Sequence, residues 1–326
     1  MCGFLAEVTV SGRILVVALN PALDVTHDVE RVDWAGVNRA SRVLVRPGGK
    51  GLNVGRVLHA LGVDVLVMGV LGGRTGEAVG DALAEVGVTA EFLAIGGETR
   101  RTFVVVDGGR GQAALFNEPG PVVSPEEYAA FRDRFVAEAG RSAAVVLTGS
   151  LPVGIPGDCY AELSELAVRA GVNVVLDADG EALRCGVAGH PTVVKPNAAE
   201  LESVAGRPVG RGDVAAIVAA AEELRRAGAE AVVVSLGADG LLAVTDEGVW
   251  RAVPPGRVGV NATGAGDAVV AGLVWRMVAG DTWPERLRHA VALGSAAAAA
   301  PAAGEFSHGE YERVLAEVRV GRVGAR

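Results

Sequence analysis

The amino-acid sequence predicts an α/β protein built on a mainly parallel sheet that helices cover. Short apolar runs rich in β-branched residues alternate with segments of helical periodicity, which is typical of βα units in a parallel sheet. The strands expected on this basis are Ile14–Leu19, Val63–Val70, Ala143–Leu147, Val172–Leu176 and Ala231–Ser235. The chain has 326 residues, of which 50% are hydrophobic, so it can bury a core large enough for such a sheet.

Four segments carry signals of helices. In Leu52–Leu61 and Val270–Met277, apolar side chains recur at positions i, i+3, i+4 and i+7, so each helix should bury one stripe against the sheet. Ser124–Glu127 combines an N-cap serine, a proline at the first helical position and a capping-box acid. Ser307–Glu310 repeats the serine and the acid, which predicts the start of a last helix.

Two segments break the alternation of strands and helices. They are Val25–Val45 and Phe92–Phe116, and the second alternates in polarity and is punctuated by glycine, as hairpins are. We expect the two segments to pair into a small separate sheet. Such a sheet is well placed to serve as a lid or as a subunit interface, and the alternative is a mere extension of the main sheet.

Composition excludes several classes of function. The 30 Lys and Arg residues against 39 Asp and Glu give a net charge of −9, which does not favour a nucleic acid or an anionic membrane as a partner. The longest run of low polarity, Ala290–Ala303, is shorter than a bilayer span and contains Pro301. Met1–Gly12 lacks the features of a signal peptide, so we expect a cytoplasmic protein with a short leader. The three cysteines form no CxxC pair, which argues against a disulfide framework and a zinc site.

The most informative segment runs from Asn261 to Asp267, between an extended stretch and a periodic helix. Gly264 and Gly266 allow a tight turn whose backbone N–H groups point outward at a helix N-terminus, and such a turn binds anions. Asp267 follows in the first helical turn, where it could accept a proton from a hydroxyl that attacks a bound phosphate. The same residues are also compatible with an ordinary glycine turn and an acidic helix cap.

Other phosphate-binding motifs do not match. Gly49 and Lys50 are followed by Gly51 in place of Ser or Thr, and no glycine lies at the P-loop distance upstream, so a Walker A motif is excluded. The glycine spacing from Gly49 to Gly55 misses the dinucleotide fingerprint by one residue. A nicotinamide-dependent enzyme is therefore the weaker hypothesis.

Polar loops follow several of the expected strands, at the sheet edge where α/β proteins bind their ligands. These loops are Asn20–Asp24, Pro47–Asn53, Gly149–Pro152 and Lys195–Glu200. Lys50 and Asn53 offer a charge and an amide to a ligand, and Asp24 could accept hydrogen bonds from sugar hydroxyls. Each loop could instead be a hinge or a cap, but packing does not explain all four.

Taken in order, these motifs resemble those of PfkB-type carbohydrate kinases of the ribokinase-like superfamily, in the branch of 1-phosphofructokinase and tagatose-6-phosphate kinase. The motifs are NPALD (Asn20–Asp24), PGGKGLNV (Pro47–Val54), GETR (Gly97–Arg100), GSLP (Gly149–Pro152), KPNAAEL (Lys195–Leu201), SLGADG (Ser235–Gly240) and GAGD (Gly264–Asp267). The resemblance implies a three-layer α/β/α core with a mainly parallel sheet and a small β-sheet lid. It also implies a leader over residues 1–12, a kinase domain over 13–320 with a lid from about 20–48 and 92–118, and a tail over 321–326.

The resemblance assigns roles on the side of the catalytic base and the nucleotide. Asp267 would be the base, and the amides around it would form an anion hole with Gly264, Ala265 and Gly266. Asn197 and Glu200 would organise the magnesium ion that accompanies ATP, without a metal site made by protein alone. The nucleotide itself would be bound by Lys195, Asn197, Glu200, Ser235, Gly237 and Gly240.

On the other side of the site, the resemblance implies a sugar phosphate as the acceptor. The sugar would be held by Asp24, Gly49, Lys50, Asn53, Arg100 and Ser150. Lys50 and Arg100, with Ser150, would lie near the phosphate that the sugar already carries, because a doubly anionic substrate needs cations at both ends.

Some positions depart from this branch. Asn261, Ala262 and Thr263 stand where a longer hydroxyl-bearing run is common, which affects contacts with the nucleotide. Ala178 and Asp179 replace a Thr-Ser pair, and the extra carboxylate could alter substrate choice or simply cap the following turn. A second arginine also follows Arg100, in place of a small apolar residue.

These observations favour transfer of phosphate from MgATP to a ketohexose monophosphate, with fructose 1-phosphate giving fructose 1,6-bisphosphate. Tagatose 6-phosphate is the rival substrate. A kinase of an unphosphorylated sugar or nucleoside would leave Lys50 and Arg100 without a phosphate. A non-catalytic sugar-phosphate sensor would need neither Asp267 nor the magnesium-organising residues. By the same resemblance we expect a homodimer formed through the lid.

Overall fold

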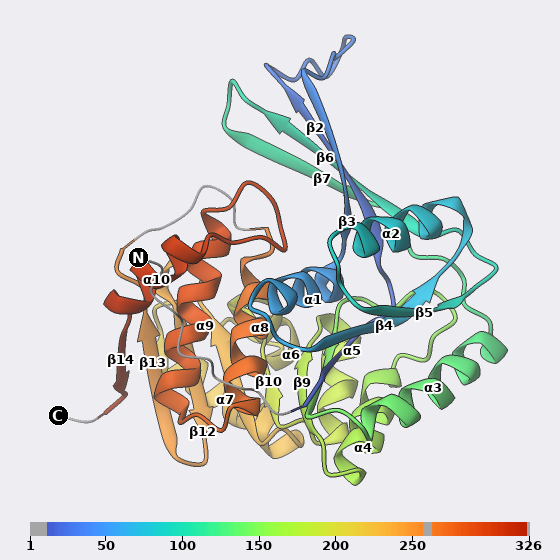
Figure 1. Ribbon diagram of the computed structural model, residues 1–326. Coiled ribbons are helices and arrows are strands. Elements are labelled where there is room, and N and C mark those ends of the chain that lie inside the picture. Colours follow the sequence, from blue (N-terminus) through green and yellow to red (C-terminus); the bar gives the residue numbers. More distant parts are fainter. Residues whose placement is uncertain (1–11, 257–262, 325–326) are drawn as a thin grey trace.

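The computed structural model describes residues 12–256 and 263–324 and has a ten-stranded sheet at its centre (Figure 1). Neighbouring strands pair in parallel from β5 to β11, and the remaining pairs, which involve β12, β13 and β14, are antiparallel. In spatial order the strands are β14 (Arg319–Arg322), β13 (Gly248–Val253), β12 (Leu241–Thr245), β11 (Ala231–Ser235), β10 (Val193–Val194), β9 (Asn173–Asp177), β8 (Ala144–Thr148), β1 (Ile14–Ala18), β4 (Val65–Leu71) and β5 (Ala90–Ala94).

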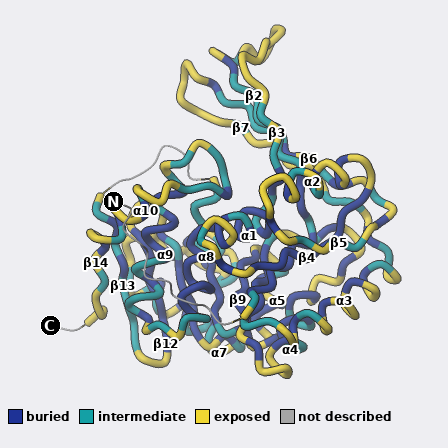
Figure 2. Tube along the Cα trace, in the orientation of Figure 1, coloured by how far each residue is buried: buried dark blue, intermediate teal, exposed yellow. Residues whose placement is uncertain are grey.

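Helices cover both faces of this sheet, and the central strands are buried on both sides (Figure 2). In β1, Ile14 and Val16 pack into one hydrophobic cluster while Leu15 and Val17 pack into the other, as the two-residue period of a strand requires. The first cluster includes side chains from α1 (Lys50–Ala60), α2 (Gly73–Glu85), α8 (Ala265–Val278), α9 (Trp283–Ala298) and α10 (His308–Glu317). The second includes α3 (Pro125–Ala139), α4 (Cys159–Arg169), α5 (Gly180–Gly186), α6 (Ala198–Ala205) and α7 (Val214–Ala227). The predicted three-layer α/β/α core is confirmed.

The helix signals in the sequence correspond to helices in the structure. The two periodic segments lie in α1 and α8. At the start of α3, the Ser124 side chain accepts a hydrogen bond from the Glu127 amide, and the Glu127 carboxylate accepts one from the Ser124 amide. Ser307 caps α10 by accepting a hydrogen bond from the Glu310 amide.

A second, four-stranded sheet projects from the body of the molecule (Figure 1). Its strands, in spatial order, are β3 (Arg42–Gly48), β2 (Ala22–Val29), β6 (Arg100–Asp107) and β7 (Gln112–Asn117). The central pair, β2 and β6, is parallel, and it joins two segments that are far apart in the sequence. The predicted small separate sheet is therefore present, and we call it the small sheet.

The structure differs from the expected boundaries at two places. Phe92–Ala94 belongs to β5, which pairs with β4 at the edge of the main sheet, so the second segment enters the small sheet only at Arg100. Gly321 and Arg322 belong to β14 and pair with β13, so the main sheet extends into the expected tail. Residues 1–11 of the expected leader, residues 325–326 and the departure at Ala262 lie outside the described residues.

Within the described residues, none of the helices has the length and apolarity needed to cross a membrane.

Candidate active site

A cavity of about 880 Å³ opens where the carboxyl ends of the parallel strands meet the base of the small sheet. Its walls come from the loops after β1, β8, β9, β10 and β11 and from the first turns of α1, α6 and α8. Every site residue predicted from the sequence lines it: Asp24, Gly49, Lys50, Asn53, Arg100, Ser150, Lys195, Asn197, Glu200, Ser235, Gly237, Gly240, Gly264, Ala265, Gly266 and Asp267. The fold thus brings together motifs that are more than 200 residues apart in the sequence.

The glycine turn before α8 forms one wall of the cavity. Gly264 has a φ of 82°, which side chains rarely adopt, and a Cβ there would lie 2.8 Å from the Cα of Ala303. Helix α8 begins directly afterwards at Ala265, so its unpaired amides face the cavity. This geometry can bind an anion at the helix N-terminus.

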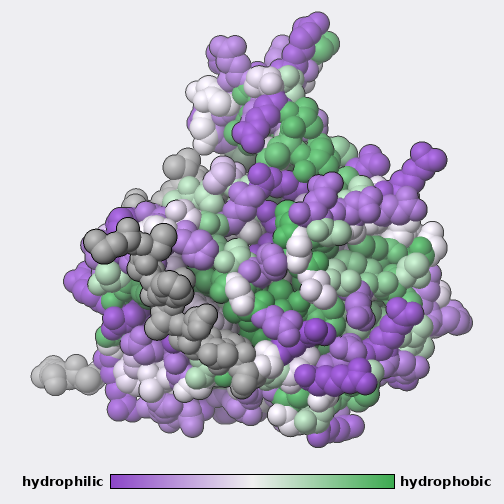
Figure 3. All heavy atoms as spheres, viewed as in Figure 1, coloured by the Kyte–Doolittle hydropathy of each residue, from purple (hydrophilic) through white to green (hydrophobic). Residues whose placement is uncertain are grey.

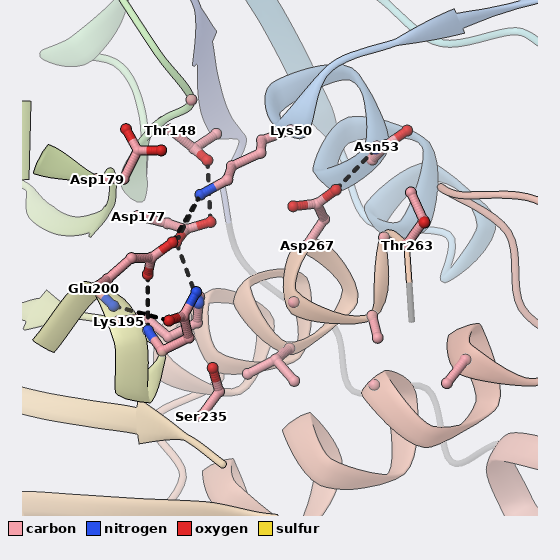
Figure 4. Close-up of a pocket in the computed structure, with 18 of the residues that line it drawn as sticks. Lys50, Asn53, Thr148, Asp177, Asp179, Lys195, Glu200, Ser235, Thr263 and Asp267 are labelled. Atoms are coloured by element: carbon pink, nitrogen blue, oxygen red, sulfur yellow. Dashed lines mark hydrogen bonds and ion pairs between the residues drawn. The ribbon is translucent and has the colours of Figure 1, made fainter. Parts of the chain in front are cut away.

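Asp267 is the buried carboxylate of this wall, with only 6% of the residue exposed. The side-chain amide of Asn53 donates a hydrogen bond to its Oδ2 at 2.8 Å (Figure 4). Burial and the charge of Asp177 raise the pKa of Asp267 to about 6, although the Asn53 hydrogen bond and the charges of Lys50 and Lys195 oppose this rise. A carboxylate with a raised pKa in a cavity is suited to accept a proton near neutral pH.

A cluster of buried charges lies across the cavity from Asp267 (Figure 4). At its centre is Asp177, the last residue of β9, whose Oδ1 lies 3.2 Å from Lys195 Nζ and 3.5 Å from Lys50 Nζ. Thr148, at the end of β8, donates a hydrogen bond to Oδ2 at 3.3 Å. Burial opposes ionisation of Asp177, but the two lysines hold its pKa below the usual value. Both lysines thus lie beside an ionised carboxylate.

Asn197 and Glu200 have a structural role at the start of α6. The Asn197 side chain accepts a hydrogen bond from the Glu200 amide, and Glu200 Oε2 accepts one from the Asn197 amide, which completes a capping box. The other carboxylate oxygen, Oε1, lies 3.7 Å from Lys50 Nζ, and Glu200 lines the cavity. Helix capping therefore leaves one oxygen of Glu200 available to a ligand.

At the end of the cavity near the small sheet, hydrogen bonds connect two of the polar loops with the start of β6. The side chain of Asn20 donates to Ser150 Oγ at 3.0 Å, and Arg100 Nε donates to the backbone oxygen of Asn20 at 3.1 Å. Burial raises the pKa of Asp24, while a hydrogen bond from Thr102 and the charge of Arg100 oppose the rise. This end presents a carboxylate, a hydroxyl and a guanidinium, which are the groups that bind a polyol with an anionic end.

Lys50 and Arg100 line the same cavity but contact different groups. Lys50 is paired with Asp177 and Glu200, whereas Arg100 contacts the loop after β1 and lies near Asp24. The side chain of Lys50 is directed toward the charged cluster (Figure 4), and the expectation that both cations lie near one phosphate stays a prediction.

The opposite end of the cavity combines small and apolar residues. Its walls include Gly237, Gly240, Leu241, Pro254, Val291, Gly294 and Ala298. Gly240 has a φ of 83°, and a Cβ there would lie 2.0 Å from the backbone oxygen of Ala252. Such a slot is suited to a flat, largely apolar ring.

The sequence matches the model of the pfkB family carbohydrate kinases over residues 14–308. The chain belongs to the PfkB family.

Solved structures of phosphofructokinases are also similar to this chain. Phosphofructokinase-2 from Escherichia coli, in complex with fructose-6-phosphate, is 30% identical, with a TM-score of 0.86 and coverage of 94% of this chain and 99% of that chain. Its tetrameric inhibited form is 29% identical, with a TM-score of 0.86 and the same coverage. A possible 1-phosphofructokinase from Thermotoga maritima is 28% identical, with a TM-score of 0.86 and coverage of 95% and 99%.

Several residues that line the cavity of this PfkB protein were missed by the sequence analysis. Asp177 and Thr148 each follow directly after an expected strand, so a polar residue at that position was a usable signal. Arg211 reaches the cavity from the loop after α6, beside Gly237, and nothing in its local sequence indicated this. Asp179, which the sequence analysis did name, also lines the cavity, and its side chain forms no capping hydrogen bond at the start of α5.

The hydrogen bond from Asn53 to Asp267 can be tested directly. Because this bond stabilises the ionised carboxylate, Asn53→Leu should raise the pKa of Asp267 above about 6. The measurement is an infrared titration of the buried carboxyl group, identified by its loss in Asp267→Asn. A titration at the same pH in Asn53→Leu and the wild type would contradict the proposed effect of this bond.

Proposed function

We propose that this PfkB protein transfers the γ-phosphoryl group of MgATP to a ketohexose monophosphate, with fructose 1-phosphate giving fructose 1,6-bisphosphate. The observation that carries the proposal is the position of Asp267: a buried carboxylate with a raised pKa, at an anion-binding turn, in a cavity with a polyol-binding end and an apolar slot. The apolar slot would take the adenine of ATP, beside Ser235, Gly237 and Gly240. The family supplies the general activity, and the contacts below support a sugar phosphate as the acceptor.

Asp267 would act as the general base. Its carboxylate accepts the proton of the acceptor hydroxyl while that oxygen forms a bond to the γ-phosphorus. The bond between phosphorus and the bridging oxygen breaks, and ADP leaves with that electron pair. The amides of Gly264, Ala265, Gly266 and Asp267, at the start of α8, stabilise the charge on the transferred phosphoryl oxygens.

Magnesium would reach this site with the nucleotide. No cluster of three or more His, Cys, Asp or Glu side chains that could hold a metal occurs within the described residues. Glu200 and Asn197 line the cavity, so they would orient the ion by accepting hydrogen bonds from its water. The ion would neutralise charge on the phosphates.

Arg100 would bind the phosphate that the sugar already carries. Its guanidinium lies beside the hydroxyl-binding groups Asp24 and Ser150, and Nε is fixed by the backbone of Asn20, which leaves its terminal nitrogens for a ligand. Fructose 1-phosphate, fructose 6-phosphate and tagatose 6-phosphate all fit this chemistry. Escherichia coli phosphofructokinase-2, which resembles this chain, has been solved with fructose-6-phosphate.

Replacement of the base should abolish most activity. Asp267→Asn should lower turnover by roughly 10²–10⁴ and leave ATP binding and thermal unfolding unchanged, because the two side chains have the same shape. In the wild type, turnover should fall as the pH falls through about 6, since the base must be ionised to accept a proton. Steady-state ADP release between pH 5 and 8 checks both expectations. Near-normal turnover in the variant would remove Asp267 from this role.

Removal of Arg100 should discriminate between substrates. Arg100→Ala should lower kcat/KM for the sugar phosphate by about 10–150-fold, the effect of losing one charge-assisted contact to a desolvated phosphate. The slow reaction with the free sugar should be nearly unaffected. ADP release is measured with free fructose, fructose 1-phosphate, fructose 6-phosphate and tagatose 6-phosphate.

Arg101→Ala is the matched control, because this neighbouring, exposed arginine contacts Thr75 outside the cavity. Equal losses on free and phosphorylated sugar in Arg100→Ala would contradict a contact to the phosphate. A wild type that prefers free sugar would overturn the sugar-phosphate assignment, and one that binds sugar phosphate without turnover would be a sensor.

The small sheet would also form a homodimer interface. Strand pairing places Val45, Val25, Phe103 and Phe116 in one row, on the face opposite the cavity-lining Asp24. The next row on that face contains Val43, His27, Val105 and Ala114. Val43, Val45 and Phe116 are about half exposed, and hydrophobic atoms are visible on this projecting part (Figure 3). An apolar sheet face of this kind suits a second copy of the same face.

A charge on this face should separate the subunits. The wild type should sediment as a dimer, and Phe116→Glu should sediment as a monomer, because two buried carboxylates would face each other across the interface. Val168→Glu, on the exposed surface of α4, is the control and should remain dimeric. A monomeric wild type, or a dimeric Phe116→Glu, would contradict this interface.

A further inference from the structure

The two lysines of the charged cluster, Lys50 and Lys195, both lie beside the same carboxylate oxygen, Oδ1 of Asp177. Lys50 comes from the start of α1, beside the small sheet, and Lys195 follows β10 on the nucleotide side. Both ammonium groups lie within 3.5 Å of Asp177 Oδ1, so they are neighbours despite their separate origins. Two adjacent cations repel each other, and the buried charge of Asp177 is what allows them to share this position.

The side chain of Lys50 is directed toward the charged cluster (Figure 4), whereas the sugar's own phosphate is proposed to lie at Arg100. Its partners are Asp177 and Glu200, and the charges of Asp267 and Asp179 are also close enough to act on it. The charges that act on it therefore include that of the base, and it shares Asp177 with the nucleotide-side lysine. In an in-line transfer, the phosphoryl group must pass between the acceptor hydroxyl and the nucleotide, which is this region of the cavity.

We propose that Asp177 is a positioning residue that holds Lys50 against the phosphoryl group in transfer, so that Lys50 acts in catalysis and does not bind the phosphate already on the sugar. This inference rests on the proposed kinase function. Lys50 then stabilises charge on the transferred phosphoryl oxygens while Lys195 remains with the nucleotide.

Asp177 is better suited to this task than the other partner of Lys50. Its side chain is 1% exposed, and it is fixed on the second oxygen by Thr148 and on the backbone by the parallel pairing of β9. Glu200 uses one oxygen to cap α6 and lies farther from Lys50, at 3.7 Å. A buried carboxylate that is hydrogen-bonded on its second oxygen fixes the ammonium group of Lys50 more firmly than a carboxylate that also caps a helix and is partly exposed.

The experiment compares Lys50→Met, Asp177→Asn and the double variant by kcat and KM for ATP, free sugar and sugar phosphate. Lys50→Met should lower kcat by about 10²-fold on both free sugar and sugar phosphate, because the lost contact acts on the phosphoryl group of ATP. Asp177→Asn should lower kcat by about 10–100-fold with KM values changed less than about threefold. The double variant should be no slower than about the slower single variant, since both changes remove the same interaction.

The pH at which kcat falls on the acid side does not depend on how much of the protein is folded. The pH profile is therefore an independent readout. Asp177 faces Asp267 together with Lys50 and Lys195, and its negative charge raises the pKa of the base. Asp177→Asn should therefore shift the acid limb of kcat to lower pH. Asp64→Asn, an exposed aspartate paired with Arg13, is the matched control and should leave kcat and the acid limb unchanged.

The outcomes separate this inference from the proposed function. Asp177→Asn leaves two cations without their buried partner, which destabilises the folded protein. Lys50 is one-third exposed, so Lys50→Met should fold, and it tests the inference even if Asp177→Asn does not fold. An active wild type whose Lys50→Met variant loses activity only on phosphorylated sugar would overturn the inference alone. Multiplicative losses in the double variant, or an unmoved acid limb, would also overturn it. A wild type without activity on any sugar would overturn the proposed function as well.

Discussion

The parallel arrangement of β1, β8, β9, β10 and β11 is the constraint on which the site depends. Parallel strands all end at the same edge of a sheet, and in this chain each of the five is followed by a loop with polar residues. The loops are far apart in sequence but form one wall of the cavity. Both faces of these strands are buried, so the edge is rigid, and side chains at the strand ends, such as Asp177, hold fixed positions.

Charge balance within the cavity supports the proposal that a divalent cation accompanies the nucleotide. Among the described residues, the lining contains five carboxylates, on Asp24, Asp177, Asp179, Glu200 and Asp267. It contains four cations, on Lys50, Arg100, Lys195 and Arg211. A nucleotide and a sugar phosphate bring several more negative charges, so the lysines and arginines cannot neutralise them alone. This excess is a physical reason to expect a divalent cation with the nucleotide.

Much of this arrangement could be predicted from the sequence because the signals are local. The periodicity of α1 and α8, the serine cap of α3 and the glycine turn at Gly264 depend on neighbouring residues only. The partners of the functional side chains could not be predicted, because they are long-range contacts. The bond from Asn53 to Asp267 spans 214 positions, and only the structure shows that this amide contacts Asp267. Similarly, the direction of Lys50 depends on Asp177, which lies on a distant strand.

The most direct test of the account is a crystal structure of the protein with a non-hydrolysable ATP analogue, magnesium and fructose 1-phosphate. The account predicts that a carboxylate oxygen of Asp267 lies about 2.6–3.2 Å from the acceptor hydroxyl, within hydrogen-bond reach. Lys50 should then contact the γ-phosphate, and Arg100 should contact the phosphate of the sugar. An acceptor hydroxyl that lies out of reach of Asp267, with another side chain in its place, would contradict the central claim.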